Sequence, residues 1–302
     1  MIGLSTFFAR LPPNARGIVA TCLAMLGFIG TDGCIKFVSD ELSISQMIVM
    51  RGVIILIFLI AIGRFTGGLD RLPGLKDRVV FLRAAAECSA TLLYYQAITR
   101  VPIANANAVL QIIPLLIVAA AALFLGEKVG WRRWLAILTG FCGVMLVVQP
   151  CADAFQGPIV FALGAALFYS FRDLSTRFID NDLSAVSINL VTSSCVILMG
   201  VVLIPFQDWH IPSIQSIAVL ALAASFLTMA YIAVTVAMRT GDVSASAPFR
   251  YSIVVWALLI DVIIFANIPS ALTIIGILIT VGSGLYLIFR ERAVQQVQNR
   301  DT

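Results

Sequence analysis

Charged residues are scarce in this chain, and histidine is almost absent. Only 12% of the 302 residues are charged and one is a histidine, whereas 60% are hydrophobic. The mean hydropathy is +1.01. So few charges cannot coat a soluble globule, and so much apolar surface cannot be buried in one core. The composition therefore indicates an integral membrane protein in contact with a lipid bilayer.

The chain also lacks the usual signatures of metal, nucleotide and disulfide chemistry. Its six cysteines show no C-x-x-C spacing and mostly fall inside apolar runs, so neither a zinc site nor a disulfide framework is expected. No G-x-x-x-x-G-K-[ST] motif is present to hold ATP phosphates. The formal charge of +4 does not indicate nucleic-acid binding, because in a membrane protein the positions of the basic residues matter more. We expect no cofactor, no metal and no nucleic-acid partner.

Long polar connections are missing too, which leaves no room for a soluble domain. Crossing the hydrocarbon core of a bilayer takes about 20 mostly apolar residues. On that criterion we predict ten transmembrane helices, at residues 17–37, 44–63, 79–98, 103–125, 131–149, 157–177, 184–205, 214–238, 243–266 and 271–289. Arg10 and Arg16 precede the first apolar run and imitate a signal peptide, but no small-residue cleavage site follows. We expect this run to be a retained span.

Several helix ends and helix contacts can be read from small residues. Ser43 with Gln46 is expected to cap the second span, Ser270 the tenth, and Asp242 or Ser244 the ninth. Small residues also permit close helix approach inside membranes. The glycines of the fifth and tenth spans are expected to do this: Gly140, Gly143, Gly276, Gly282 and Gly284.

One segment of the first half recurs in the second half. Residues 32–43 and 173–184 both read Asp, three residues, Lys or Arg, Phe, four residues, Leu-Ser, at a constant offset of 141. The sequence therefore predicts two repeats, residues 1–150 and 151–302, each with five helices. Because five is odd, the second repeat enters the membrane from the opposite side. We expect an all-α integral membrane protein with ten transmembrane helices in two inverted five-helix repeats, an architecture of many secondary transporters.

The positions of Lys and Arg predict the orientation. With the N-terminus in the cytoplasm, nearly all basic residues fall at the cytoplasmic face, and only Lys36 and Arg100 fall outside. This bias predicts cytoplasmic N- and C-termini. The oligomeric state is left open, with a homodimer as one option.

Ionisable residues inside spans are costly, and they usually face a cavity or a partner. Arg83, Glu87 and Tyr94 share one face of the third predicted helix. One interpretation gives Glu87 a coupling proton or a cationic ligand, with Arg83 receiving a substrate carboxylate. The other is a structural ion pair that holds two helices together.

Amide and aromatic side chains supply the other candidates for substrate binding. Asn107 and Gln111 share a face of the fourth span, which we expect to kink at Pro114. Interhelical hydrogen bonds would explain these amides equally well. Rings inside the spans can stack on a flat ligand or simply pack. The remaining substrate-binding candidates lie on the sixth, eighth and ninth spans: Tyr169, Tyr231, Arg250, Tyr251 and Trp256.

The repeated segment itself offers candidates for gates. Asp32 and Lys36 are four residues apart, as are Asp173 and Arg177, so each pair forms either a local bridge or a gate at one mouth of the pathway. For Asp261, near the outer end of the ninth span, and Arg51, in the outer third of the second, snorkelling to the headgroups is the simple interpretation.

Particular motifs give the chain a family likeness. In the first half they are Ala97 to Ala108, Pro114-Leu115 and Phe124-Leu-Gly-Glu-Lys-Val-Gly-Trp-Arg-Arg133. In the second half they are Ala247-Pro-Phe-Arg-Tyr251, Val255-Trp-Ala257, Pro269-Ser270 and Ser283-Gly-Leu-Tyr286. With these the chain resembles EamA-type transporters of the drug/metabolite transporter superfamily. One departure is that Phe265-Ala-Asn267 stands where the family often has Phe-Gly-Glu, so a symmetric role for Glu127 is in doubt.

The resemblance implies movement of a small organic solute across the bacterial inner membrane. Relatives are said to handle amino acids, aromatic compounds, riboflavin or S-adenosylmethionine. Secondary transport of a flat or amphiphilic metabolite is therefore the leading hypothesis, with or without a coupling proton. A membrane sensor or scaffold is the first alternative. An intramembrane enzyme is the second, although no nucleophile with a base or metal cluster supports it.

Overall fold

The computed structural model describes residues 12–66, 77–124, 130–148, 157–176, 178–179, 183–239 and 247–298, and these residues form helices and connections with no strand. The first half contains α2 (Pro13–Val38), α3 (Ile44–Thr66), α4 (Arg78–Ile98), α5 (Ile103–Leu110), α6 (Ile113–Phe124) and α7 (Trp131–Val148). The second half contains α8 (Ile159–Thr176), α9 (Ala185–Leu203), η1 (Ile204–Phe206), α10 (Ile214–Arg239), η2 (Ala247–Tyr251), α12 (Ser252–Ile263) and α13 (Ala271–Gln298).

Length and composition identify six clear membrane spans among the described helices. They are Ala15–Val38, Ile44–Phe65, Ile103–Ala120, Ile159–Thr176, Val186–Phe206 and Ile214–Tyr231. The apolar parts of α7 and α13 are shorter, at Trp134–Val147 and Ala271–Tyr286. Of the other predicted spans, α4 carries Arg83 and Glu87 within its length, and α12 has only 12 residues. The protein is thus an all-helical, multi-pass membrane protein.

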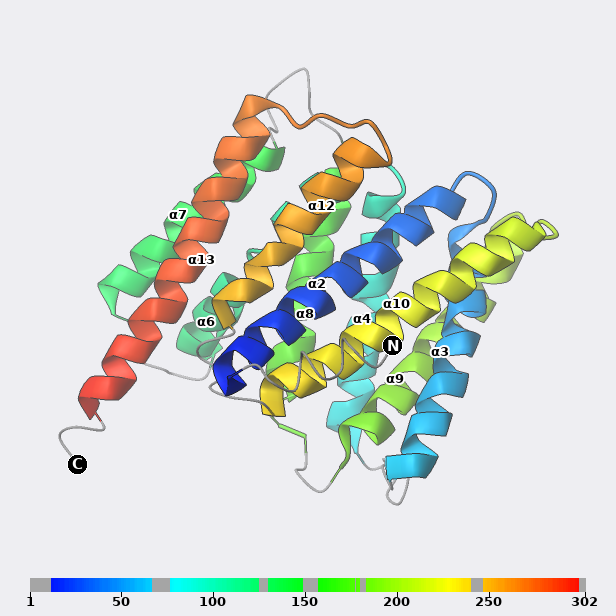
Figure 1. The fold of residues 1–302 in the computed structure, drawn as a ribbon, viewed down its shortest axis with the longest axis horizontal. Coiled ribbons are helices and arrows are strands. Elements are labelled where there is room, and N and C mark those ends of the chain that lie inside the picture. The colour runs from blue at the N-terminus through cyan, green and yellow to red at the C-terminus, as the bar shows by residue number, and fades with distance from the viewer. Residues whose placement is uncertain are drawn as a thin grey trace.

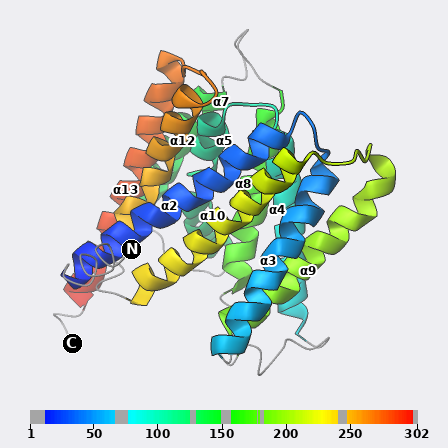
Figure 2. The ribbon, with the colours of Figure 1, turned by 45° about the vertical axis from the view of Figure 1, so that its right-hand side comes forward.

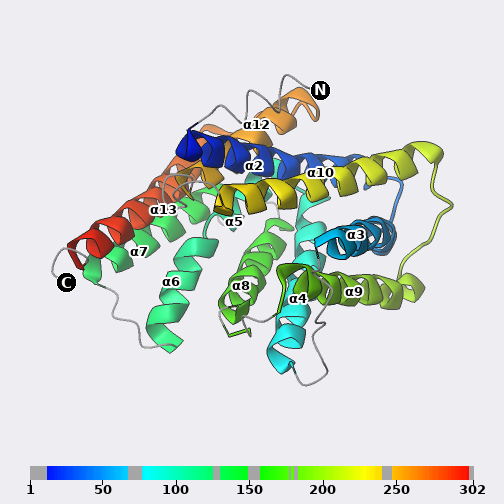
Figure 3. The ribbon, with the colours of Figure 1, turned by 60° about the horizontal axis from the view of Figure 1, so that its bottom comes forward.

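The long helices pack in pairs that each join one half of the chain to the other. The main pairs are α2 with α10, α4 with α8, α3 with α9 and α7 with α13. Figures 1 and 2 show α7 beside α13 at one end of the molecule and α3 beside α9 at the other. In Figure 3, α2 and α10 run alongside each other across one face, above α4 and α8. The halves therefore interlock instead of forming separate bodies.

Glycine allows the closest of these contacts. An added Cβ on Gly143 of α7 would lie 2.8 Å from the Thr280 nitrogen and 2.9 Å from the Gly276 oxygen, both backbone atoms of α13. On Gly276 it would lie 2.6 Å from the Gly143 oxygen. These positions confirm the predicted close approach of the two helices. Gly282 does not contribute to it, because a Cβ there would meet open space.

The predicted caps at Ser43 and Ser270 form, and those at Asp242 or Ser244 lie outside the described residues. Gln46 accepts the Ser43 backbone N–H at 3.2 Å, which is half of a capping box at the start of α3. The Ser270 hydroxyl accepts the Thr273 N–H at 3.2 Å at the start of α13. Such bonds satisfy backbone donors that the first helical turn leaves unpaired.

The fourth predicted span is broken rather than continuous. It divides at the turn formed by Gln111 and Ile112, so α5 ends at Leu110. Leu110 is four residues before Pro114. In a continuous helix the Pro114 ring would clash with the Leu110 carbonyl, and the Pro114 nitrogen could not donate a hydrogen bond to it. The predicted kink is therefore confirmed, one turn ahead of the proline. The ninth predicted span also differs, because η2 precedes α12 where a continuous α-helix is expected.

Candidate functional site

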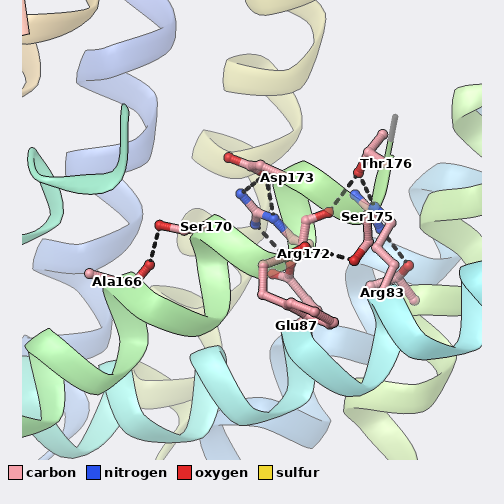
Figure 4. A network of polar contacts seen from close by, with 10 residues as sticks. Arg83, Glu87, Ala166, Ser170, Arg172, Asp173, Ser175 and Thr176 are labelled. Carbon is pink, nitrogen blue, oxygen red and sulfur yellow. Dashed lines mark hydrogen bonds and ion pairs between the residues drawn. The ribbon is translucent and has the colours of Figure 1, made fainter. Parts of the chain in front are cut away.

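A cluster of charged side chains joins α4 to α8. The Arg172 guanidinium lies 2.8 Å from the Glu87 carboxylate across the two helices and 2.7 Å from the carboxylate of Asp173. About a quarter or less of the Arg172 and Glu87 side chains is exposed, at 24% and 20%. Figure 4 shows Arg172 between its two acidic partners, with Arg83 nearby. We call Arg83, Glu87, Arg172 and Asp173 the α4–α8 charge cluster.

Arg83 does not pair with Glu87, although they are four residues apart on α4. Its Nε donates to the Thr176 hydroxyl at 3.0 Å and one terminal nitrogen donates to the Thr192 hydroxyl at 2.8 Å. Neither acceptor carries a charge, so no acidic partner neutralises Arg83 through a direct ion pair among the described residues. The ion pair that links two helices forms with Arg172 instead.

Aromatic rings extend the cluster toward α2. The Arg172 guanidinium lies over the Tyr169 ring, 4.6 Å from its centroid. The Tyr169 and Tyr94 rings meet edge to face, with centroids 6.4 Å apart and planes at 65°. Tyr231 of α10 contacts Phe28 edge-on at 6.0 Å and lies within electrostatic reach of the cluster. The aromatic rings therefore lie next to the charged groups of the cluster, and a ligand could contact both.

Asp32 occupies the other end of this chain of contacts. Its carboxylate accepts the Tyr94 hydroxyl at 2.6 Å and the Asn107 amide at 3.2 Å. The Asn107 amide also donates to the Tyr94 hydroxyl oxygen at 2.9 Å, which closes a triangle between α2, α4 and α5. Gln111 donates to the backbone oxygen of Asn107 at 3.0 Å, within its own helical segment. The local Asp32–Lys36 bridge considered above does not form.

Lys36 and Asp261 bind backbone atoms around the α4–α5 turn. The Lys36 ammonium donates to the carbonyls of Ile98 and Val101 and lies 5.5 Å from the centroid of the Phe265 ring. We call Lys36, Asp261 and this turn the α4–α5 clamp.

The Asp261 carboxylate caps the start of α5 from across the helix bundle. It accepts the backbone N–H groups of Ile103 at 3.1 Å and Ala104 at 2.5 Å. The backbone N–H of Asn267 donates to the backbone oxygen of Asp261 at 2.9 Å. Asp261 is only 1% exposed, so the expected snorkelling to the headgroups is wrong. The reason is that the carboxylate accepts the orphan N–H groups of a buried helix start, which otherwise have no acceptor.

The remaining candidates lie apart from the cluster. Arg250 is exposed on η2, and Arg177 lies outside the described residues. The buried Tyr251 hydroxyl and the Trp256 indole nitrogen have no hydrogen-bond partner within the described residues. The Tyr251 hydroxyl instead abuts Gly284 of α13. Among the described side chains, no hydrogen bond, ion pair or ring contact joins Arg250, Tyr251 or Trp256 to Arg172.

Sequence reasoning did not single out every residue that the geometry brings together. The sequence places Arg172 beside Tyr169 and Asp173 on the sixth predicted span, but nothing in it indicates that Arg172 pairs with Glu87 on another helix. Thr176 and Thr192 resemble ordinary helix-packing hydroxyls, and only their contacts with Arg83 distinguish them. Within the described residues, no group of three or more His, Cys, Asp or Glu side chains could hold a metal ion.

Comparison with known proteins identifies the family. The model of the EamA-like transporter family matches residues 4–149 and again residues 156–290. The chain belongs to the EamA-like transporter family. The two matches cover nearly the whole chain, and they agree with the resemblance found in the sequence motifs.

Relatives within and near the EamA-like family are named for small metabolites. An S-adenosylmethionine uptake transporter of Rickettsia conorii is 28% identical over 65% of this chain and 66% of its own length. A riboflavin transporter of Vibrio cholerae is 29% identical over 62% of this chain and 63% of its own length. The chain thus spans slightly less than two thirds of each of these relatives. A solved crystal structure aligns with a TM-score of 0.63 at 19% identity, over 90% of this chain and 96% of that one, which supports the fold alone.

Proposed function

We propose that the protein is a secondary transporter that moves a small, charged, ring-bearing metabolite across the bacterial inner membrane by alternating access. Both termini lie in the cytoplasm in this proposal, and ten transmembrane segments form two inverted repeats. The α4–α8 charge cluster with Tyr169 and Tyr94 binds the substrate, and the α4–α5 clamp lies at the outer face. No ATP is needed, so transport is driven by a gradient.

The cluster is the observation that carries this proposal. Arg172 lies in the span Ile159–Thr176, and Glu87 lies on α4, which the proposal also places across the membrane, where an ion pair is expensive unless it has a function or a partner. Their charges are bonded to each other, so a zwitterionic ligand can replace each partner without leaving a bare charge. A substrate carboxylate would take Arg172 or Arg83, and a substrate cation would take Glu87.

The helix pairing supports the inverted repeats. Exchanging the two halves replaces α2, α3, α4 and α7 by α8, α9, α10 and α13. The pair α2/α10 then becomes α8/α4, while α3/α9 and α7/α13 map onto themselves, and all of these contacts occur. The smaller contacts of α10 with α3 and of α4 with α9 are exchanged in the same way. Such symmetry is expected if the halves alternate between equivalent roles.

The ring contacts and the relatives together favour the substrate class. Tyr94 and Tyr169 offer ring surface next to the Arg172 guanidinium, which suits a flat ring that also bears a charge. S-adenosylmethionine has an aromatic base, an amino-acid group and a sulfonium charge, and riboflavin has a flat tricyclic ring. We take these two compounds as the first probes.

Uptake by proteoliposomes tests the proposal. Purified protein in liposomes is expected to take up radiolabelled S-adenosylmethionine or riboflavin with saturation, and empty liposomes are expected to take up neither. Amino acids and nucleosides are added as competitors to extend the substrate range. If monodisperse, folded protein carries none of these compounds, the transporter proposal fails and a sensor or scaffold role replaces it.

A further inference from the structure

Asp32 is a membrane-embedded carboxylate that has polar donors but no bound cation. It lies in α2, within the span Ala15–Val38. Its two hydrogen bonds come from Tyr94 and Asn107, which are both neutral. Among the described residues, the ion pairs of the helical core join Arg172 to Glu87 and to Asp173, and none includes Asp32. Asp32 and Glu87 are therefore in opposite situations.

The charged groups around Asp32 are few. Arg51 of α3 is within electrostatic reach, but its guanidinium lies over the Tyr95 ring at 5.3 Å, and its buried Nε has no hydrogen-bond partner. The other titratable groups in reach are Tyr95 of α4, Tyr169 of α8 and Cys34 on α2 itself. The helices α10 and α12 and the short η2 also pack on α2. They contribute Tyr231 of α10, which contacts Phe28, Asp261 of α12, which is held in the α4–α5 clamp, and Arg250 of η2, which is exposed.

This surrounding can accommodate both protonation states of the carboxyl group. Ionised Asp32 accepts both donors in charge-assisted bonds. Both donors reach the same oxygen, Oδ2, so Asp32 protonated at Oδ1 still accepts the Tyr94 hydroxyl and the Asn107 amide, with Oδ2 as its carbonyl oxygen. Glu87 has no such freedom, because losing its charge would leave Arg172 with one acidic partner instead of two.

We propose that Asp32 carries the coupling proton of the transport cycle, and that Glu87 does not. The inference rests on the proposed transport function and names the ion that drives it. At one face an O–H bond of a hydronium ion breaks as the carboxyl O–H bond of Asp32 forms, which leaves water. At the other face the carboxyl O–H bond breaks and the proton passes to a water molecule, which becomes hydronium.

A continuous set of contacts connects this proton to the substrate site. Tyr94 donates to Asp32 and contacts the Tyr169 ring, and Tyr169 carries the Arg172 guanidinium on its face. Protonation converts two charge-assisted bonds that tie α2 to α4 and α5 into neutral ones, which are roughly half as strong. The proton on Asp32 therefore loosens α2 from the helix that contributes Glu87 to the substrate site.

Substrate accumulation under a pH gradient measures this coupling directly. At zero membrane potential, a gradient of one pH unit drives a one-proton coupled carrier to about a tenfold substrate ratio. Wild-type proteoliposomes, clamped with valinomycin and potassium, are tested with gradients of both signs, using whichever of S-adenosylmethionine and riboflavin they carry. Counterflow exchange at equal pH is measured in parallel, since it requires substrate movement but no net proton movement.

We expect Asp32→Asn to exchange substrate but to lose gradient-driven accumulation, with a ratio of about 1, and Asp32→Glu to accumulate again. The matched control is Asp208→Asn, a change of an exposed loop carboxylate, which should accumulate as the wild type does. Accumulation by Asp32→Asn equal to the wild type would overturn the inference. So would wild-type exchange without any response to the gradient, which would leave the transport function standing. Absence of both exchange and uptake in the wild type would overturn both.

A labelling measurement on the unmodified chain covers the case in which Asp32→Asn does not fold. Dicyclohexylcarbodiimide adds to protonated carboxyl groups in apolar surroundings, and mass spectrometry locates the adduct. We expect labelling of Asp32 that falls as the pH rises, and little labelling of Glu87. Labelling of Glu87 in place of Asp32 would contradict the inference.

Discussion

The α4–α5 clamp and the α4–α8 charge cluster both place charges inside a membrane protein, but they use them differently. In the clamp, Lys36 and Asp261 bind backbone carbonyls and N–H groups. In the cluster, Arg172 and Glu87 bind each other, and Arg83 binds two hydroxyls. A backbone group at a buried helix end is left unpaired when its charged partner moves away. A charged side chain, in contrast, can exchange its side-chain partner for a charged group of a ligand.

The clamp is therefore expected to have a structural role, and the cluster a role in binding. Charges bonded to backbone fix the α4–α5 turn against α2 and α12, and we expect their loss to reduce stability. Charges bonded to other side chains are available to a substrate, and we expect their loss to reduce binding. The following changes test this distinction, from the largest expected effect to the smallest.

Removing the buried carboxylate of the clamp should have the largest effect on stability. Asp261→Ala leaves the N–H groups of Ile103 and Ala104 without an acceptor at a buried helix start, which should cost about 3 kcal/mol. Thermal unfolding in detergent measures the loss. Asp40→Ala, at an exposed position beyond α2, is the control and should change stability by less than about 0.5 kcal/mol. Equal losses in the two variants would show that the cap contributes nothing.

Replacing the Arg172 guanidinium of the cluster by an ammonium group should reduce substrate binding rather than stability. Arg172→Lys removes the planar stacking on Tyr169 and the fork that reaches both Glu87 and Asp173, so apparent substrate affinity should fall about tenfold, or about 1.4 kcal/mol. Uptake kinetics in proteoliposomes report the affinity. Arg100→Lys, on an exposed residue bonded to Gln96 near the end of α4, is the matched control and should leave it unchanged. An unchanged affinity in Arg172→Lys would remove the cluster from the substrate site.

A smaller effect is expected at the turn that follows Asp261. Ala266 has a positive φ of 52°, a conformation that costs an alanine about 1 kcal/mol and that glycine adopts freely. Ala266→Gly should raise stability by about 0.5–1 kcal/mol, partly offset by the greater freedom of glycine in the unfolded chain. Calorimetry or thermal unfolding detects the gain. Destabilisation by this change would mean that the alanine methyl group has a packing role.

The smallest effect is expected at Glu41, an exposed carboxylate that binds near the start of a helix as Asp261 does. Glu41, between α2 and α3, accepts the Ser216 hydroxyl at 2.5 Å and the Ser213 backbone N–H at 2.6 Å near the start of α10. The Ser216 hydroxyl, followed by the Ser213 N–H, lowers the pKa of Glu41 from its ordinary value of 4.5. A lowered folded-state pKa means that this stabilisation is present above pH 4.5 and is lost as the pH falls through the folded-state value.

The Glu41 contribution is measured from the unfolding temperature between about pH 3 and pH 6. We expect the wild type to lose stability toward the acid end more steeply than Glu41→Gln. Identical pH profiles would show that the bonds to Ser213 and Ser216 have no net effect.

The sequence predicted the helical membrane fold because spans depend on long apolar runs and their ends on short-range rules. The Ser43 and Ser270 caps and the kink before Pro114 follow from residues within four positions of each other. The partners of charged residues could not be predicted in this way. Glu87 was matched with Arg83 by helical spacing, but Arg172, 85 residues further along, lies closer across the α4–α8 contact.

The family departure at residues 265–267 shows the same limit. The sequence identifies the loss of an acidic residue at Asn267 but not its reason. In the structure the Asn267 backbone N–H bonds to the Asp261 backbone oxygen, which brings residue 267 next to the buried Asp261, where a second carboxylate would be repelled. Ala266 has the positive φ that suits glycine, although alanine stands at this position of the turn.

The most direct test of the assigned roles is the stabilisation of each variant by substrate. A ligand at about one hundred times its Kd stabilises the protein that binds it by about 2.7 kcal/mol. With S-adenosylmethionine or riboflavin, whichever the wild type binds, we expect the unfolding temperature of the wild type and of Lys36→Met to rise by similar amounts. We expect no rise in Arg172→Met. A rise in Arg172→Met equal to that of the wild type would contradict the assignment of the α4–α8 charge cluster as the substrate site.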